Sequence, residues 1–428
     1  MELMRILLCV SLAICAAHAA RVVCYMDSRA RIRQGTGKFE APTDLEPALS
    51  TCTHVVYGFA VIDGATNKLV PLDEYQELDS GKGYYRAVTN LKKRYPGLNI
   101  LLSVGGNADP DNDKYLTLDS RKAFVNSARI LLRQYAFDGL DLAWQFPEIR
   151  PKKDRGTFGS IWHGIKKTFG YSHSHKDEKA EEHRDGFTKL VKDLKNSLKP
   201  DGLMLTLTAL PNTDPSIYYD LKDIEPNLDF INVMAFNYTA PERKPDEADY
   251  PAALYQAGGR RHKSAESGKI YIFRNGTLSN KIILGIPTFG ETWKLTEDSK
   301  ISGVPPINTD GPGEAGPYTK TPGLLSYAEV CTLLPNSNVK TTAAPHLLRL
   351  VTDPSHKLGS YAFRFPQSDT EGVWVAYEDP DTAGYKGAYV KNKSLGGIAI
   401  WDLTLDDFRG VCNGERFPIL KAAKRTIL

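Results

Sequence analysis

The chain has 428 residues and a formal net charge of +3 at pH 7, from 54 lysines and arginines against 51 aspartates and glutamates. So small an excess, with basic residues dispersed among acidic ones, does not favour nucleic acid as a partner. The length fits either two domains or one large α/β barrel.

The amino-terminal residues predict a secretory signal peptide over residues 1–20. Arg5 is followed by the apolar run Ile6 to Ala17 and then by small residues, with a cleavage position after Ala19 or Ala20. The run is too short to span a bilayer, and no later segment is apolar enough to do so. We therefore expect a secreted, extracellular protein without membrane insertion.

The cysteines predict disulfides rather than a metal site. Two of the six cysteines lie in the predicted signal peptide, and the other four are Cys24, Cys52, Cys331 and Cys412. An even number in an oxidising compartment indicates two disulfides, and spacing alone allows three pairings. No two of the four stand at Cys-x-x-Cys spacing, so we predict no metal.

Eight short apolar runs predict the strands of one barrel. They begin near Val22, His54, Asn99, Phe137, Leu203, Phe230, Lys281 and Gly396, the seventh running from Lys281 to Phe289. Near-continuous apolar runs are typical of parallel strands that are covered on both faces. Amphipathic stretches such as Ser120 to Ala136 lie between most of them. This alternation predicts a (β/α)₈ barrel, whose site lies at the carboxyl ends of its strands.

Two connections are too long for plain barrel loops. The segment Lys294–Tyr377 has strand-like runs of its own and predicts a small α+β subdomain, with the barrel formed by residues 21–293 and 378–428. The insert Glu148–Asp185 carries aromatic residues among basic ones, which suits either a recognition surface or a helical excursion packed on the barrel. These aromatic residues are Phe158, Trp162, Phe169 and Tyr171.

The fourth predicted strand, in the stretch FDGLDLAWQFP, has unusual chemistry for an enzyme site. Asp141, Ala143 and Gln145 share one parity, so on a strand they point to the same face. A hydrolase would place carboxylates on such a face. This strand offers one carboxylate, one methyl group and one neutral amide.

Four motifs in order resemble those of the family 18 chitinases. DGLDLAWQFP resembles the family's fourth-strand motif Asp-Gly-x-Asp-x-Asp-Trp-Glu-Tyr-Pro, and three more match in order: SVGG (Ser103–Gly106), MAFN (Met234–Asn237) and GGIAIWDLTLDDF (Gly396–Phe408). The resemblance covers nearly the whole mature chain and implies a TIM barrel with a chitinase-type insertion subdomain. Within the family, the signal peptide, the lost acid and the long charged insert resemble the insect imaginal disc growth factors. These are secreted proteins thought to stimulate cell growth together with insulin.

The departures from the family pattern imply a degenerate chitinase. Gln145 replaces the catalytic Glu, Ala143 replaces the Asp that assists it, and Phe236 and Asn237 replace a Tyr and an Asp. The family's mechanism uses the acetamido oxygen of the substrate as nucleophile and the Glu as general acid. A glutamine has no titrating proton near neutral pH, and losing a general acid costs about 10²–10⁴ in rate. We therefore expect no hydrolase activity and no cofactor.

The sequence is compatible with two functions. The first is a growth factor that promotes cell proliferation through a cell-surface receptor or an extracellular protein. The alternative is a lectin that binds chitin or N-acetylglucosamine oligosaccharides without cutting them, because aromatic faces stack on sugars even when the acid is lost. The candidate sugar-binding residues are Tyr25, Phe59, Asp141, Trp144 and Trp401.

The family pairs its cysteines as Cys24–Cys52 and Cys331–Cys412, and we predict the same pairs here. The chain also has three N-glycosylation sequons. Asn275 precedes a glycine and is expected in an accessible turn. We rank Asn275 and Asn237 above Asn392 as glycosylation candidates.

Overall fold

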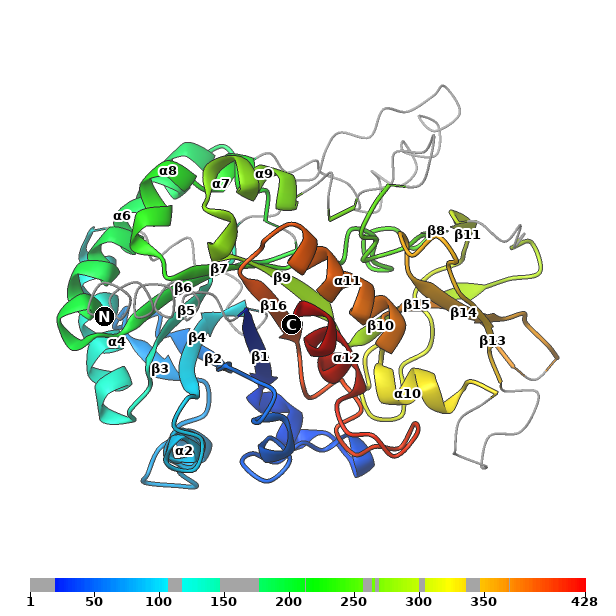
Figure 1. Ribbon diagram of the computed structural model, residues 1–428, viewed down its shortest axis with the longest axis horizontal. Helices are drawn as coiled ribbons and strands as arrows, with labels where there is room; N and C mark the ends of the chain where they lie inside the picture. The colour runs from blue at the N-terminus through cyan, green and yellow to red at the C-terminus, as the bar shows by residue number, and fades with distance from the viewer. Residues whose placement is uncertain are drawn as a thin grey trace, which may run out of the picture.

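A closed barrel of eight parallel strands forms the larger part of the fold, as predicted. The computed structural model describes residues 20–106, 118–146, 177–211, 213–256, 264–265, 269–299, 305–335, 347–368 and 370–428. Around the barrel the strand order is β1-β16-β9-β7-β6-β5-β4-β2, and the pairing of β1 with β2 closes it (Figure 1). These strands are β1 (Arg21–Asp27), β2 (His54–Ile62), β4 (Asn99–Gly105), β5 (Gly139–Ala143), β6 (Met204–Ala209), β7 (Phe230–Val233), β9 (Ile282–Pro287) and β16 (Gly397–Trp401).

Helices cover the outside of the barrel (Figure 1). In α6, Phe187, Leu190, Val191, Leu194 and Leu198 recur at helical spacing and are all buried, which gives this helix an apolar face toward the strands. The described helices around the barrel are α2 (Glu74–Glu77), α3 (Tyr84–Thr89), α4 (Leu118–Gln134), α6 (Ala180–Leu198), α7 (Pro215–Tyr218), α8 (Leu221–Ile224), α9 (Lys269–Gly276), α11 (Pro380–Asn392) and α12 (Pro418–Ile427). None of the described helices is both long and apolar enough to cross a membrane.

A second, antiparallel sheet lies to one side of the barrel between β9 and β16 in sequence (Figure 1). Its strand order is β12-β10-β15-β14-β13, and α10 (Tyr327–Thr332) follows β12. The strands are β10 (Phe289–Leu295), β12 (Leu324–Ser326), β13 (Arg349–Val351), β14 (Ser360–Arg364) and β15 (Gly372–Tyr377). Two short pairings complete the strands: β3 (Leu69–Pro71) with β2, and β8 (Glu247–Ala248) with β11 (Ile307–Asn308).

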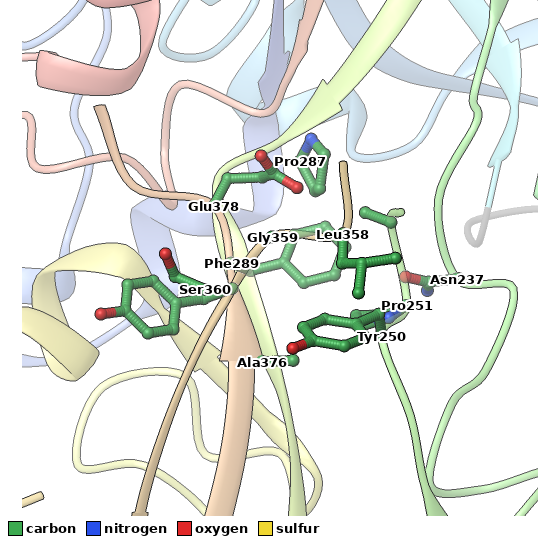
Figure 2. Close-up of a pocket in the computed structure, with 12 residues that line it drawn as sticks. Asn237, Tyr250, Pro251, Pro287, Phe289, Leu358, Gly359, Ser360, Ala376 and Glu378 are labelled. Atoms are coloured by element: carbon green, nitrogen blue, oxygen red, sulfur yellow. The ribbon is translucent and has the colours of Figure 1, made fainter. Parts of the chain in front are cut away.

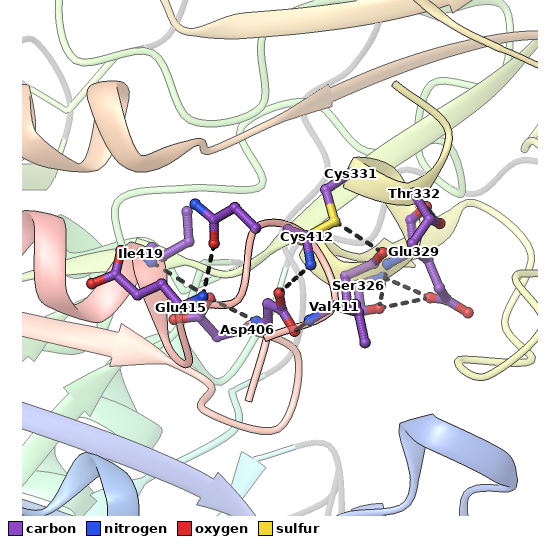
Figure 3. The surroundings of a disulfide bond; sticks show 12 residues. Ser326, Glu329, Cys331, Thr332, Asp406, Val411, Cys412, Glu415 and Ile419 are labelled. Carbon is purple, nitrogen blue, oxygen red and sulfur yellow. Dashed lines mark hydrogen bonds between the residues drawn. A yellow bond between two sulfur atoms is a disulfide. The ribbon is translucent and has the colours of Figure 1, made fainter. Parts of the chain in front are cut away.

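Both predicted disulfides are present. Cys24 in β1 is joined to Cys52 just before β2, and Cys331 in α10 is joined to Cys412 in the segment after β16. Figure 3 shows the second bond beside the capping box of α10, in which Ser326 and Glu329 bind each other's backbone N–H groups. This disulfide therefore ties the helix of the insertion to the last segment of the barrel.

Most of the long insert after β5 lies outside the described residues, and so do Phe158, Trp162, Phe169 and Tyr171. Its described end begins at Asp177, whose carboxylate contacts His183 Nδ1 at 2.8 Å and accepts a hydrogen bond from the Tyr218 hydroxyl at 2.9 Å. These contacts hold the start of α6 against α7.

Candidate functional site

A cleft of about 690 Å³ opens at the carboxyl ends of the barrel strands. Its lining comes from the ends of β1, β2 and β16, from the segments that follow β5, β6 and β7, and from the insertion. The lining includes Tyr25, Asp27, Arg29, Ile32, Arg33, Gln34, Phe59, Gln145, Leu210, Phe236, Asn237, Phe289, Lys320, Trp401 and Asp402. The position agrees with that of ligand sites in (β/α)₈ barrels.

Three of the five sugar-binding candidates form an aromatic group in this cleft. The ring of Trp401 lies 4.7 Å from that of Tyr25 and 5.9 Å from that of Phe59, centroid to centroid. Trp401 is the most accessible of the three, since Tyr25 and Phe59 are buried beneath it. A flat, partly exposed ring on an apolar base is suited to stacking against a sugar or against another ring.

Asp141 is not available to a ligand, contrary to its place among the sugar-binding candidates. Its side chain is fully buried inside the barrel, where it accepts hydrogen bonds from Thr206 at 2.7 Å, Ser103 at 2.8 Å and Thr208 at 2.8 Å. Burial raises the pKa of this carboxyl, although the hydroxyl donors act in the opposite direction. Asp141 therefore organises the barrel interior and does not line the cleft.

Trp144 is also wrong as a sugar-binding candidate. Its ring is fully buried on the outer face of the barrel, against Phe124 of α4 and Phe187 of α6. The alternation of side chains along the strand predicts that Trp144 faces away from Asp141 and Gln145. The structure agrees with this alternation and not with the assignment of Trp144 to a sugar site. Trp144 packs the barrel against its helices.

Of the four positions that depart from the family pattern, three line the cleft and Ala143 is buried beneath it. Gln145 is half-buried and lines the cleft just beyond β5. Ala143 is fully buried in an apolar cluster with Phe59 and Leu210, against which Trp401 also packs. Phe236 lines the cleft and contacts the ring of Phe289 at 5.8 Å. An amide and a phenyl group therefore line this part of the cleft, and the Ala143 methyl group packs behind its aromatic lining.

Asn237 is a poor glycosylation candidate, which corrects its high ranking. It is half-buried at the junction of the barrel and the second sheet, beside Pro251, Tyr250 and Leu358 (Figure 2). Its amide donates a hydrogen bond to the carboxylate of Glu291, whose side chain is only 4% exposed. The Asn237 backbone is in the left-handed region, with φ of 50°. A glycan at Asn237 would have to be accommodated beside Tyr250, Pro251 and Leu358, in this half-buried position.

The other two sequons are open to solvent. Asn275 is exposed in the last turn of α9, not in the separate turn predicted from its neighbouring glycine. Asn392, ranked lowest from the sequence, is exposed at the end of α11.

Charged residues at one side of the cleft escaped the sequence analysis. Asp27, at the end of β1, binds Arg29 through an ion pair of 2.6 Å, and Arg33 donates to the carbonyl of Thr404 at 2.7 Å. Burial raises the pKa of Asp402 to about 6, with Asp27 adding to the shift and Arg33 opposing it. Their positions in the sequence could have indicated these residues, because Asp27 follows the first predicted strand and Asp402 ends the last one.

One group of residues is close enough together to hold a metal ion in the described chain: Cys331, Asp407 and Cys412. The two sulfur atoms are joined in a disulfide, so they cannot serve as thiolate ligands. The Asp407 carboxylate already accepts hydrogen bonds from the backbone N–H groups of Val411 and Cys412. The group is structural.

The family model for glycosyl hydrolases family 18 matches residues 21–406. The chain belongs to this family. It is 52% identical to the chitinase-like protein EN03 of Bombyx mori over 98% of this chain and 97% of the relative. It is 44% identical to imaginal disk growth factor 6 of Drosophila melanogaster over 94% and 92% of the two chains. These relatives confirm the resemblance to the imaginal disc growth factors.

A solved structure is similar over nearly the whole length of the chain. Human YKL-39, described as a pseudo-chitinase with retained chitooligosaccharide binding properties, superposes with a TM-score of 0.74 at 27% identity. The match covers 96% of this chain and 100% of YKL-39.

Proposed function

We propose that the chain is a secreted, non-catalytic member of family 18 that promotes cell proliferation and growth through a cell-surface partner, together with insulin. The observation that carries the proposal is that the amide of Gln145 lines the cleft. The resemblance of the fourth-strand motif assigns this position to the family's acid. An amide cannot protonate a glycosidic oxygen. The kinship with imaginal disk growth factor 6 supports the growth-promoting role.

Asp402 does not restore the missing acid in this proposal. Its pKa of about 6 would suit proton transfer near neutral pH. It follows Trp401 on β16, however, and its Oδ1 already accepts hydrogen bonds from the backbone N–H and the hydroxyl of Thr404. The family's acid instead follows β5, at the position that Gln145 occupies here.

The test is to add the purified secreted protein to responsive cultured cells, with and without insulin. We expect a dose-dependent rise in cell number that is larger with insulin, and no release of sugar from chitin oligomers by the same preparation. Chitin hydrolysis that disappears in Asp402→Asn would reject the non-catalytic assignment. An absence of any effect on cells that respond to a related growth factor would reject the growth-promoting role.

Chitooligosaccharide binding is the second candidate function. The aromatic group of Trp401, Phe59 and Tyr25 favours it, as does the similarity of the fold to YKL-39, a pseudo-chitinase that retains chitooligosaccharide binding. Titration with N-acetylglucosamine oligomers separates the two: micromolar affinity that grows with chain length favours a lectin. Millimolar or undetectable affinity favours a protein partner alone.

A further inference from the structure

A second, smaller pocket, here called the α11 pocket, lies between the insertion and α11. Its volume is about 230 Å³, and none of the described residues lines both this pocket and the cleft. One wall is the connection between β13 and β14, residues 352–359, and the other is the start of α11 with the residues just before it. Small-molecule sites usually measure about 300–1,000 Å³, so this pocket suits a single side chain or a small molecule rather than an oligosaccharide.

Carboxylates outnumber cations around the α11 pocket. Four acidic and two lysine side chains line it, which gives a net charge of −2 with His356 neutral: Asp353, Glu378, Asp379, Asp381, Lys357 and Lys386. Asp353 accepts hydrogen bonds from the N–H groups of Ser355 at 2.9 Å and Leu358 at 2.7 Å. Desolvation alone would raise the pKa of Asp353, but these donors hold it below its ordinary value. The pocket is therefore negatively charged at neutral pH.

The side chain of Glu378 has one buried oxygen without a partner. Glu378 directly follows β15, beside Pro287 (Figure 2), and is only 3% exposed. Its Oε1 accepts a hydrogen bond from Lys386 Nζ at 2.5 Å, and Lys386 also donates to the carbonyl of Ala252 at 2.7 Å. Its Oε2 has no hydrogen-bond partner among the described residues. A buried acceptor that stays unsatisfied is costly, so an N–H donor that reaches Glu378 through the pocket removes this cost.

An aromatic ring lies at the rim of the α11 pocket. The ring centroid of Tyr385, in α11, is 3.9 Å from that of His356 on the opposite wall. Desolvation and the negative charges of Asp381 and Asp379 raise the pKa of the Tyr385 hydroxyl, which indicates a negative potential around this ring. The face of a tyrosine ring attracts a cation within about 6 Å, and the nearby carboxylates act in the same direction.

A metal ion and an anion fit these residues less well than an organic cation. A metal ion needs several ligand atoms close together, and in the described part of the chain only Cys331, Asp407 and Cys412 meet that condition. The first turn of α11 would favour an anion, but the Asp379 carboxylate already accepts the N–H of Thr382 there at 2.8 Å. The surrounding carboxylates would also repel an anion. An organic cation matches both the charge and the ring.

We propose that the α11 pocket binds an organic cation, an ammonium or guanidinium group on a short apolar stem. The Glu378 carboxylate accepts its N–H groups, and the ring of Tyr385 lies against its charge. Leu254 and Leu358 line the space for the stem. Such a group is carried both by free amines and by the lysine and arginine side chains of proteins. The site is separate from the cleft and does not rest on the proposed function.

Titration with small cations tests the ligand chemistry. The probes are n-butylguanidinium, n-butylammonium and butylurea, which has the planar shape of the guanidinium but no charge. Ligand-observed NMR with the full secreted chain should show saturable binding of both cations, with dissociation constants of about 1 mM or lower, and no binding of butylurea. Raising the salt concentration from about 50 to 500 mM should weaken the binding, because part of the attraction comes from charges at the solvent-exposed rim.

Variants of the lining residues locate the site. Glu378→Gln should weaken cation binding by more than about tenfold, because the charge-assisted hydrogen bond is lost. Tyr385→Ala should weaken it by about threefold or more, whereas Tyr385→Phe, which keeps the ring, should change it by less than about twofold. Asp381→Asn should weaken it by about two- to fivefold, since the charge that it removes is exposed.

Two matched controls remove a ring and a charge elsewhere. Tyr271→Ala removes a ring that is 60% exposed on α9, and Glu181→Gln removes an exposed charge from α6. Neither residue lines the α11 pocket, so both variants should keep the affinity of the unmodified chain. Thermal midpoints report folding. If Glu378→Gln does not fold, the variants of Tyr385 and Asp381 decide the result, because both side chains reach solvent.

A capped Gly-Arg-Gly peptide distinguishes the two sources of the cation. Binding of the peptide at least as tight as that of n-butylguanidinium assigns the pocket to a side chain of a protein, and binding of the free cations alone assigns it to a small amine. The proposal is overturned if neither cation binds saturably, if butylurea binds equally well, or if the pocket variants and the controls have the same affinity. Each of these readouts is independent of the growth assay.

Discussion

Asp141 shows how a surviving family residue can be structural. Asp141→Ala would leave the hydroxyls of Ser103, Thr206 and Thr208 buried without their shared acceptor. Each unsatisfied buried group costs about 1–3 kcal/mol, so we expect the free energy of unfolding to fall by about 3 kcal/mol or more. Urea denaturation measures the change, and Asp141→Asn, which keeps one acceptor oxygen, should lose less. A loss below about 0.5 kcal/mol in the alanine variant would contradict this role.

Restoring the family's groups should restore hydrolysis only in combination. Gln145→Glu alone would supply a proton donor at the cleft but leave a methyl group at Ala143 and a phenyl group at Phe236. We expect at most trace activity from it on N-acetylglucosamine oligomers. The variant that also carries Ala143→Asp, Phe236→Tyr and Asn237→Asp should show activity, non-additively, because these groups act as a unit. Substantial activity in the single Gln145→Glu variant would contradict this dependence.

The sequence correctly predicted the face of β5 on which each residue lies. It did not predict which of these residues line the cleft. Alternation placed Asp141 and Gln145 together and Trp144 opposite, as the structure has them. Alternation does not predict how far along the barrel axis each residue lies. Asp141 lies inside the barrel and is buried, whereas Gln145 lies beyond the end of β5 and lines the cleft. The contact of Asn237 with Glu291 joins segments from β7 and β10, and no local pattern indicates it.

At the scale of elements, apolar runs located all eight barrel strands but did not mark where the chain leaves the barrel. The apolar pattern predicts one strand over Lys281 to Phe289, but this run contains β9 and the first residue of β10. Thr288 separates the two strands: its N–H donates to the carbonyl of Trp401 at 3.1 Å and its hydroxyl to that of Asp402 at 2.6 Å. Both strands are buried, so hydrophobicity continues through the turn.

The start of α12 should make stability depend on pH. Asp406 accepts hydrogen bonds from the N–H groups of Leu420 at 3.2 Å and Asp407 at 2.8 Å, and burial raises its pKa to about 7. Between about pH 4 and pH 7 the folded protein therefore keeps a proton that the unfolded chain has lost. The stability contributed by this group is present at low pH and is lost as the pH rises through that interval.

The Asp406→Asn variant isolates this effect, because it keeps an acceptor oxygen and cannot titrate. We expect the difference in unfolding free energy to shift in favour of the variant as the pH rises from about 5 to 8, by up to about 3 kcal/mol, because about two pH units of this interval lie below the folded pKa and each is worth about 1.4 kcal/mol. Denaturant titrations at several pH values measure it. A difference that does not change with pH would show that Asp406 is charged throughout.

At the scale of the whole molecule, sugar binding and growth promotion should be separable. Trp401 supplies the accessible ring of the cleft floor, whereas a macromolecular partner would also contact the charged residues around Asp27, Arg29 and Lys320. Trp401→Ala should therefore weaken any binding of N-acetylglucosamine oligomers by up to about tenfold, since an aromatic contact is worth about 0.5–1.5 kcal/mol beyond the area that it buries. Growth promotion should change much less, because many contacts share the energy of a protein interface and only a few dominate it.

The expected pattern needs both readouts on the same preparations. Isothermal titration measures the oligosaccharide affinity of the unmodified protein and of Trp401→Ala, and cell counts at graded doses measure growth promotion. The matched control is Phe365→Ala, which removes a ring that is 48% exposed on the second sheet and does not line the cleft. If Trp401→Ala removes both activities while remaining folded, the partner is recognised through the sugar-stacking floor itself. That outcome would favour a glycan on the partner as the group that the cleft binds.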